Sequence, residues 1–473
     1  MDDSENIAAQ PLPSAEYRPD PIKDEEDRLT GPFVARVLDC VAAGDNDTAR
    51  ALVEPLHPAD VADLIELAAA DEREGLVAAL AEIVDADVYA ELNEHVRETL
   101  LDEMAPERVA ELAGELDTDD AVALIEDLEA HEQRAVLDRM EPDDRAAVEE
   151  ALTYAEETAG RLMQRDLIAV PEHWTVGAVI DYLRSSEELA TDFWEIFVVS
   201  PDHHPIGTCK LSTILRSPRD RAVGELMQRE QTLIPVDLDQ EEVALKFQKY
   251  ALISAAVIDG SGRLVGMITV DDVVHVIEEE ASEDTLALAG AGEGDINEPV
   301  RDAYKDRVRW LIANLGTALI ATLVISRFEA TIEQFAILAA LMPIVAALGG
   351  NAGTQALAVT VRAIATNQLT SSNRWRTIKR ELSVAVLNGA TIAILLGLGV
   401  WAVLGNRDLG AVIAAAILVN IIVAGLAGVL VPLTLERVGS DPAVASSVFV
   451  TTVTDSMGFL AFLGLATLAG LGA

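Results

Sequence analysis

Positive charge is scarce in this chain of 473 residues, and lysine is scarcer still. The chain has 34 Lys and Arg residues against 80 Asp and Glu, a net charge of −46, and only six of the 34 are Lys. Because binding to nucleic acid phosphates depends on Lys and Arg, this balance argues against a nucleic-acid partner. An acidic surface poor in lysine predicts halophilic adaptation, since high salt screens most of the self-repulsion.

Cysteine and catalytic motifs are equally sparse. Cys40 and Cys209 lie far apart, which excludes a disulfide scaffold and a cysteine-rich zinc site and indicates a reducing compartment. The seven histidines are scattered, and neither a P-loop nor a nucleophile–base pair is recognisable, so we expect no enzymatic activity. Residues 1–30 are acidic, contain proline and lack a signal-peptide pattern, and we expect them to form a disordered tail.

The charge is distributed unevenly along the chain. From Arg301 onward there are 12 basic and 9 acidic residues, a net charge of +3, which leaves −49 for residues 1–300. We therefore expect a strongly acidic soluble portion joined to a nearly neutral apolar portion. The acidity of the soluble portion permits cation binding.

Repeated patterns divide the soluble portion into two kinds of structure. Residues 31–150 contain short segments that open with Pro or Asp and continue with apolar residues at helical spacing, such as HPADVADLIELAAA and APERVAELAGEL. These segments predict an all-α helical-repeat N-terminal domain. Residues 151–215 and 216–282 each show the order strand, helix, strand, glycine-containing turn, strand and helix, which predicts a duplicated α/β unit.

Five apolar stretches follow, and each approaches or exceeds the roughly 20 residues that span a bilayer. They are Trp310–Ser326, Phe335–Val361, Leu382–Leu404, Leu409–Leu435 and Pro442–Leu471. They predict an α-helical transmembrane domain of five spans over residues 308–473. Because Arg and Lys concentrate in alternate flanks, the positive-inside rule predicts a cell-membrane protein with a cytoplasmic N-terminus and an external C-terminus.

The fifth stretch contains one carboxylate, Asp455, and no basic residue follows Pro442. An ionised group at membrane depth costs about 2.5–3.5 kcal/mol by insertion scales, so its presence indicates a function. Ser447, Thr451 and Gly458 share its helical face and produce a polar stripe. Such a stripe is what a cation path requires.

The second stretch carries Pro343 and then LGGNAGTQ over Leu348–Gln355. Proline and closely spaced glycines weaken a helix, and irregular backbone at membrane depth is tolerated where it is buried in protein or lines water. The amides Asn351 and Gln355 favour pore lining, although the glycines also allow close packing of helices. In the fourth stretch, Asn420 stands at helical spacing from small residues and predicts an interhelical hydrogen bond.

These segments together resemble the MgtE family of magnesium channels and transporters. The resemblance covers almost the whole chain and rests on TAGRLM (Thr158–Met163), RLVGMITVDDVVHVIEEEASED (Arg263–Asp284), PIVAALGGNAGTQ (Pro343–Gln355) and DPAVASSVFVTTVTDSMG (Asp441–Gly458). It implies that the duplicated units are cystathionine-β-synthase (CBS) units. It also implies that residues 283–307 form a connecting helix between these units and the membrane.

The resemblance further implies a mechanism. In a homodimer, the second and fifth spans of both subunits would form a pore in which Asp455 holds hydrated Mg²⁺. The residues expected to line the pore are Gly350, Asn351, Gly353, Thr354, Thr451 and Gly458. The residues expected to bind regulatory Mg²⁺ and so to close the pore are Asp271, Asp272, Glu280, Glu283 and Asp284.

Two departures from the family pattern leave details of this mechanism open. Val448 stands where the family usually has Pro, which affects the contacts at the pore entrance, and His275 stands where it often has Asp, which affects the number of cytosolic ions. Other interpretations remain. The chain could be a membrane-anchored CBS nucleotide sensor that binds ATP near Asp271 or Asp272, a membrane enzyme with Mg²⁺ as cofactor, or a channel for Co²⁺, Mn²⁺ or Ca²⁺.

Overall fold

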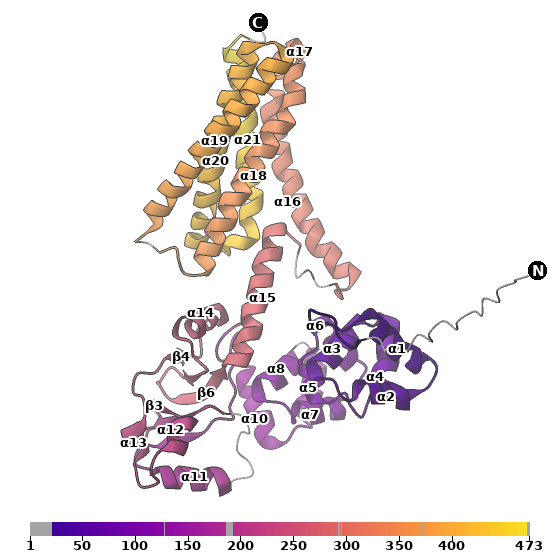
Figure 1. Cartoon of the computed structure of the whole chain (residues 1–473), viewed down its shortest axis with the longest axis vertical. Helices are drawn as coiled ribbons and strands as arrows, with labels where there is room; N and C mark the ends of the chain where they lie inside the picture. Colours follow the sequence, from indigo (N-terminus) through magenta and orange to yellow (C-terminus); the bar gives the residue numbers. More distant parts are fainter. Residues whose placement is uncertain are drawn as a thin grey trace, which may run out of the picture. The chain divides into compact units, whose positions relative to one another are not determined.

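The structure is a computed structural model that describes residues 21–126, 128–185, 193–291, 294, 296–370 and 372–470 (Figure 1). The chain divides into two compact units. One comprises the residues up to 240 together with 253–269, and the other comprises 241–252 and the residues from 270 onward. Residues 1–20 of the expected tail lie outside the described part of the chain.

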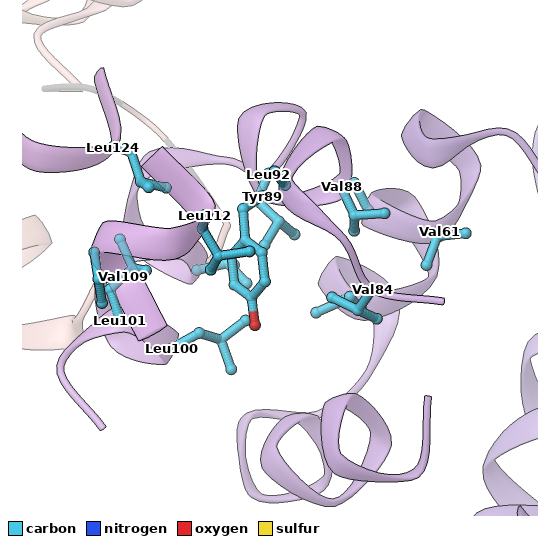
Figure 2. Packing of buried hydrophobic residues seen from close by; sticks show 14 of the residues in the cluster. Val61, Val84, Val88, Tyr89, Leu92, Leu100, Leu101, Val109, Leu112 and Leu124 are labelled. Carbon is cyan, nitrogen blue, oxygen red and sulfur yellow. The ribbon is translucent and has the colours of Figure 1, made fainter. Parts of the chain in front are cut away.

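Short α-helices follow one another through the first part of the acidic portion, as the sequence predicts. They are α1 (Gly31–Ala42), α2 (Asn46–Val53), α3 (Pro58–Leu67), α4 (Ala70–Ala79), α5 (Ala86–Ala90), α6 (Glu94–Leu101), α7 (Pro106–Ala113), α8 (Thr118–Glu126), α9 (Ala130–Leu137) and α10 (Pro142–Ala151). Proline opens α3, α7 and α10, where its missing N–H sacrifices no helical hydrogen bond. The helices enclose one apolar core. Tyr89 lies inside it near Leu100 and Leu112, and burial raises the pKa of Tyr89 to about 12 (Figure 2).

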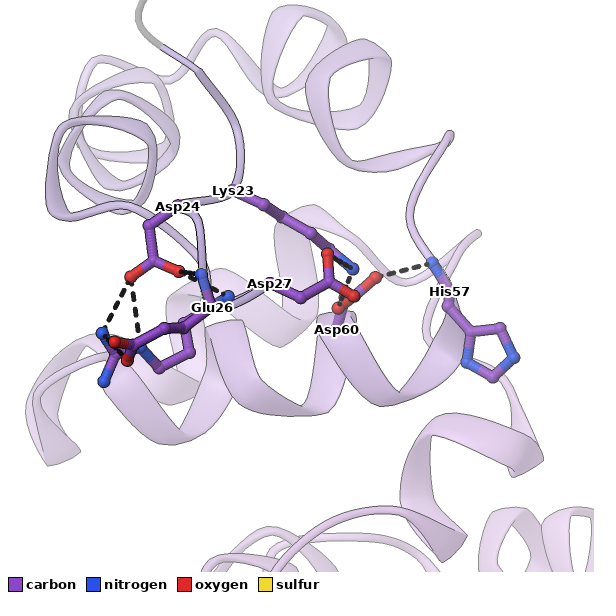
Figure 3. A network of polar contacts seen from close by, with 7 residues as sticks. Lys23, Asp24, Glu26, Asp27, His57 and Asp60 are labelled. Carbon is purple, nitrogen blue, oxygen red and sulfur yellow. Dashed lines mark hydrogen bonds and ion pairs between the residues drawn. The ribbon is translucent and has the colours of Figure 1, made fainter.

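Residues 21–30, which we expected to belong to a disordered tail, are ordered. Lys23 pairs with Asp60 at 2.9 Å, and Asp24 accepts two backbone hydrogen bonds from the turn that follows it (Figure 3). Leu29 is buried in the core of the helical domain. The expectation was wrong for this segment because its polar composition does not reveal that Leu29 is buried or that Lys23 pairs with Asp60.

Two three-stranded sheets confirm the predicted duplication. Their orders are β1 (Ala169–Pro171), β2 (Glu195–Val199), β3 (Pro205–Lys210) and β4 (Leu233–Pro235), β5 (Ser254–Ile258), β6 (Leu264–Thr269). In each sheet the first pair of strands is parallel, the second pair is antiparallel, and the register shifts at the last residue of the middle strand. Phe197 of the first sheet and Met267 of the second share an apolar core. The helices of these units are α11 (Val176–Ser185), α12 (Leu211–Arg216), α13 (Val223–Leu226) and α14 (Gln240–Tyr250).

The segment expected to form one connecting helix over residues 283–307 is divided between two helices. The first is α15 (Val270–Ala289), which follows β6 directly, and the second is α16 (Val300–Ser326), which begins after Pro299. Gly290 and Gly294 lie between them with φ values of +68° and +71°. Glycine adopts this left-handed backbone readily, so the chain leaves α15 at Gly290 and the single-helix expectation is wrong.

Five helices of the described chain are long and apolar enough to cross a membrane, as the sequence predicts. They are α16, α18 (Ile337–Ala365), α19 (Arg374–Leu404), α20 (Arg407–Val438) and α21 (Pro442–Leu468), and the short α17 (Glu329–Gln334) precedes α18. Within this bundle α20 is the most buried and packs against α18, α19 and α21 (Figure 1). The position of α20 places α18 and α21 side by side, and these are the two helices that carry the predicted pore residues.

Candidate functional site

The glycines of α18 bring neighbouring helices into close contact. A Cβ atom on Gly353 would lie 2.7 Å from Cγ1 of Val450, and a Cβ atom on Gly349 would lie 2.1 Å from Nδ2 of Asn420. Both distances are far below van der Waals contact, so a side chain at Gly353 would displace Val450 and a side chain at Gly349 would displace the Asn420 amide. Gly349 and Gly353 therefore serve helix packing, which was the alternative that the sequence left open.

The helix α18 is continuous through Pro343 and the glycines, so the expectation of irregular backbone in this span was wrong. Pro343 is exposed, and it removes only one backbone hydrogen bond from a helix of 29 residues. The small residues in α18 are explained by its close approach to α20 and α21 and require no break in the helix.

Polar side chains of α18 lie on its exposed surface. Asn351 and Thr354 are exposed in the single chain, and the space that a Cβ atom on Gly350 would occupy is open. The Thr354 hydroxyl donates to the Gly350 carbonyl at 3.0 Å, which leaves its oxygen able to accept a hydrogen bond. Because lipid offers no hydrogen-bond partners, this surface requires water or another protein surface.

Asp455 lies half-buried on α21, directly after Thr454, whose methyl group is one of the atoms closest to Gly353. Among the described residues, no side chain forms an ion pair with the Asp455 carboxylate or donates a hydrogen bond to it. Thr451, one turn earlier, is exposed, and its hydroxyl donates to the Ser447 carbonyl at 2.8 Å. The carboxylate and the hydroxyl are thus available to a ligand at the level where α18 and α21 meet.

Asn420 fills the space between the two glycine-bearing helices. Its side chain is 1% exposed, and its Nδ2 donates to the Val345 carbonyl of α18 at 3.0 Å, which is the interhelical bond that the sequence predicts. A Cβ atom on Gly458 of α21 would lie 2.6 Å from the same nitrogen. Gly458, expected to line the pore with Thr451, therefore packs against α20 within the single chain. The interhelical bond was predictable from the sequence because Asn420 is a single amide within an otherwise apolar stretch.

The acidic residues expected to sense Mg²⁺ all lie on one helix, α15. They are Asp271, Asp272, Glu280, Glu283 and Asp284. In the described chain, no group of three or more His, Cys, Asp or Glu side chains is arranged to hold a metal ion.

The C-terminal half of α15 lies next to the membrane helices. Burial raises the pKa of Asp284, and the negative charge of Asp441 raises it further. Asp441 caps α21 by accepting a hydrogen bond from the Ala443 N–H at 2.7 Å. Two carboxylates are therefore close together at the start of the helix that carries Asp455.

Two apolar residues near the end of α15 pack against a buried cluster in the membrane bundle, and α15 contacts α21. Ala287 and Leu288 pack against a buried cluster that includes Leu357 of α18 and Val450 of α21. The helix that carries the acidic residues thus contacts α21 and packs against a cluster to which α18 also contributes.

Comparisons with known proteins match these parts of the chain. The family model MgtE, described as a divalent cation transporter, matches residues 342–465. The model of the MgtE intracellular N domain matches residues 56–157, and the CBS domain model matches residues 223–279. The candidate ion path of α18 and α21 lies within the first of these matches.

Curated relatives and a solved structure are similar over longer segments. The magnesium transporter MgtE of Thermus thermophilus is 35% identical over 327 residues, 68% of this chain and 72% of that protein. The magnesium transporter MgtE of Bacillus subtilis is 29% identical over 440 residues, 92% of this chain and 97% of that protein. A crystal structure of the cytosolic domain of the Mg²⁺ channel MgtE in complex with ATP is 30% identical, covers 51% of this chain and 99% of its own, and has a TM-score of 0.47.

Proposed function

The chain belongs to the MgtE family of divalent cation transporters, and we propose that it transports Mg²⁺ through a pore that α18 and α21 line in a homodimer. The observation that carries this proposal is the Asp455 carboxylate, which has no partner among the described residues and follows Thr454, whose methyl group lies close to Gly353 of α18. A charge at membrane depth is retained where it serves an ion pathway.

A second copy of the chain explains the exposed polar residues. Asn351, Thr354 and Thr451 would face lipid in a monomer, where their hydrogen-bonding groups have no partners. If two copies meet along this surface, the same groups line a water-filled path between them. Homodimerisation is therefore part of the proposal.

Mg²⁺ suits the chemistry of this path. The ion prefers six oxygen ligands and releases its water reluctantly, so a pore can bind it through its hydration shell with few carboxylates. Two copies of Asp455 would supply two negative charges, and the neutral oxygens of Thr451 and Asn351 would accept hydrogen bonds from the bound water. Oxygen ligands of this kind do not select soft metals, but they do not by themselves distinguish Mg²⁺ from other divalent ions. Flux of Co²⁺ and Mn²⁺ is therefore the comparison for Mg²⁺ flux.

We further infer that cytosolic Mg²⁺ closes the pore through α15. This helix carries Asp271 and Asp272 in its first turn, and Leu288 in its last turn packs against the cluster that Leu357 of α18 and Val450 of α21 share. Divalent ions that bridge the carboxylates of α15 to a second acidic surface would fix the position of the helix, and the contact at Leu288 would transmit that position to the pore. The shift can be no larger than the difference in Mg²⁺ affinity between the two states.

Ion flux into liposomes tests the transport proposal. Asp455→Asn keeps the size of the side chain but removes its charge, and we expect Mg²⁺ flux to fall at least tenfold while the melting temperature stays close to that of the wild type. Glu333→Gln, on an exposed residue of α17 before the start of α18, is the matched control and should retain wild-type flux. Equal Mg²⁺ flux in the wild type and Asp455→Asn would reject Asp455 as the pore site.

Nucleotide binding at the CBS pair and the cytoplasmic orientation of the N-terminus stay predictions. The first is tested by binding of radiolabelled ATP to the purified chain, and the second by protease access to the acidic portion in sealed vesicles.

A further inference from the structure

A basic cavity lies between the end of α18 and the start of α19. It has a volume of about 450 Å³ and is lined by the end of α18, the loop that follows and the first turns of α19. Three arginines line it, Arg362, Arg376 and Arg380. Gln368 and Thr377 add further polar groups to the lining. A cavity lined by several arginines is suited to a phosphate group.

The charge around this cavity contrasts with that of the rest of the chain. Residues 362–380 contain five Lys or Arg residues and no Asp or Glu, although the whole chain has a net charge of −46. Arg380 pairs with Glu381 at 2.9 Å. Within the described chain, however, neither Arg362 nor Arg376 forms an ion pair with an acidic side chain. Two guanidinium groups are therefore available to an anion from outside the chain.

The wall of the cavity is held in place by its own hydrogen bonds. Asn373 donates from Nδ2 to the Gln368 carbonyl at 2.7 Å and accepts at Oδ1 from the Thr370 N–H at 2.9 Å. Leu369 is buried against Val429 and Leu433 of α20. Gln368 and Asn373, which line the cavity, are therefore held by hydrogen bonds within the described part of the chain, as a binding site requires.

The surroundings of the cavity favour a lipid as the source of the phosphate. The cavity lies at the ends of two membrane-spanning helices, on the side that the positive-inside rule predicts to be cytoplasmic. Trp375 precedes Arg376 at the start of α19 and is 65% exposed, and the Lys379 ammonium lies 5.6 Å from its ring centroid, as is typical of residues at a membrane interface. Further along α19, Leu387 is 69% exposed and continues an apolar surface that suits acyl chains.

We propose that this cavity binds the headgroup of an anionic phospholipid, with Arg362 and Arg376 on the phosphate. Basic pockets between membrane helices on the cytoplasmic side hold anionic headgroups by charge and by paired hydrogen bonds. The bound lipid would link the end of α18, which carries the candidate pore residues, to the start of α19. This site depends neither on Asp455 nor on the identity of the transported ion.

Quenching of tryptophan fluorescence by brominated lipid tests the proposal on the full chain in phosphatidylcholine vesicles. Replacing part of the lipid with dibrominated phosphatidylglycerol should quench the wild type more strongly than dibrominated phosphatidylcholine does, because Trp375 lies in the same first turn of α19 as Arg376. In Arg362→Gln/Arg376→Gln, the preference for phosphatidylglycerol over phosphatidylcholine should fall by about fivefold for each arginine that is replaced. Arg307→Gln/Arg437→Gln removes the same charge from exposed sites on the same predicted side and should keep the preference.

Three results would overturn the proposal. One is equal quenching of the wild type by the two lipids, which needs no variant and does not depend on variant folding. Another is an equal loss in both double variants, which indicates diffuse attraction by surface charge. The third is loss of the preference when inorganic phosphate replaces chloride at matched ionic strength, which indicates a site for soluble phosphate.

Discussion

The side-chain amide of Asn420 on α20 donates to the backbone carbonyl of Val345 on α18 at 3.0 Å. The same amide lies against both Gly349 and Gly458, one on each candidate pore helix. Asn420 therefore sets the separation of α18 and α21 without lying on their exposed polar surface. The geometry of the ion path depends on this buried contact as well as on the residues that line the path.

This contact predicts different effects of alanine at two adjacent glycines. Gly349→Ala places a methyl group 2.1 Å from Asn420 Nδ2 and should destabilise the bundle by about 1–3 kcal/mol, as overpacking does. Gly350→Ala meets no atom within 4 Å, so it should leave the melting temperature of the purified chain nearly unchanged.

A double variant identifies the cause of this difference. Asn420→Ala removes the atoms that clash with the new methyl group, so adding Gly349→Ala to it should cost little further stability. Additive losses in the double variant would show that the methyl group clashes with something other than Asn420.

The pair of carboxylates at Asp284 and Asp441 predicts a stability effect that depends on pH. Burial and the charge of Asp441 raise the pKa of Asp284 in the folded chain. The folded state therefore loses stability as pH rises above about 3.9, the pKa of Asp in the unfolded chain. This loss of stability is complete once pH exceeds the pKa of Asp284 in the folded chain. Asp284→Asn should raise the melting temperature at pH 7 and lose this advantage near pH 4.

The control for this prediction is Glu278→Gln on the same helix, at an exposed position. It should leave the pH profile of melting unchanged. A melting temperature at pH 7 that falls in Asp284→Asn would mean that the ionised carboxylate is stabilised in the fold, contrary to the proposed repulsion.

The contact between α15 and the membrane helices predicts a variant with altered regulation. Leu288→Ala removes apolar contacts with the cluster around Leu357 and Val450, so it should weaken the coupling between α15 and the pore. Mg²⁺ flux should persist, but its inhibition by Mg²⁺ on the side of the acidic portion should need a higher concentration. Thr285→Ala, on an exposed position of the same helix, should behave like the wild type. An unchanged inhibition curve in Leu288→Ala would contradict coupling at this contact.

The acidic portion predicts a requirement for salt. Residues 1–300 carry a net charge of −49, so their self-repulsion is strong in dilute buffer. At molar ionic strength the Debye length is about 3 Å, and this repulsion is screened. The melting temperature of the full chain should therefore rise markedly between 0.1 and 2 M KCl, measured at a fixed low Mg²⁺ concentration. A flat response would remove the halophilic interpretation.

Much of the fold follows from patterns that are local in the sequence. Five apolar stretches give five membrane helices, and the repeated order of strands and helices gives two matching sheets. These patterns are reliable because burial requires periodic apolar residues, whatever the partner helix or strand. The hydrogen bond of Asn420 was predictable for the same reason, since a buried amide must find a partner.

The parts that sequence reasoning missed depend on what one element meets in space. The order of residues 21–30 depends on Asp60 and on the core that receives Leu29. The continuity of α18 depends on neighbours that fill the space above Gly349 and Gly353, which composition does not reveal. The break at Gly290 was missed because the acidic run before it and the basic residues after it both suit a helix.

Cross-linking at Thr451 tests most directly the claim that two copies of α21 face one ion path. In a Cys40→Ser/Cys209→Ser background, Thr451→Cys should join two chains through a short bifunctional maleimide in vesicles, and Mg²⁺ should slow the reaction. Leu395→Cys, 64% exposed on α19, should remain monomeric under the same conditions. Cross-linking at position 395 without any at position 451 would contradict the proposed pore.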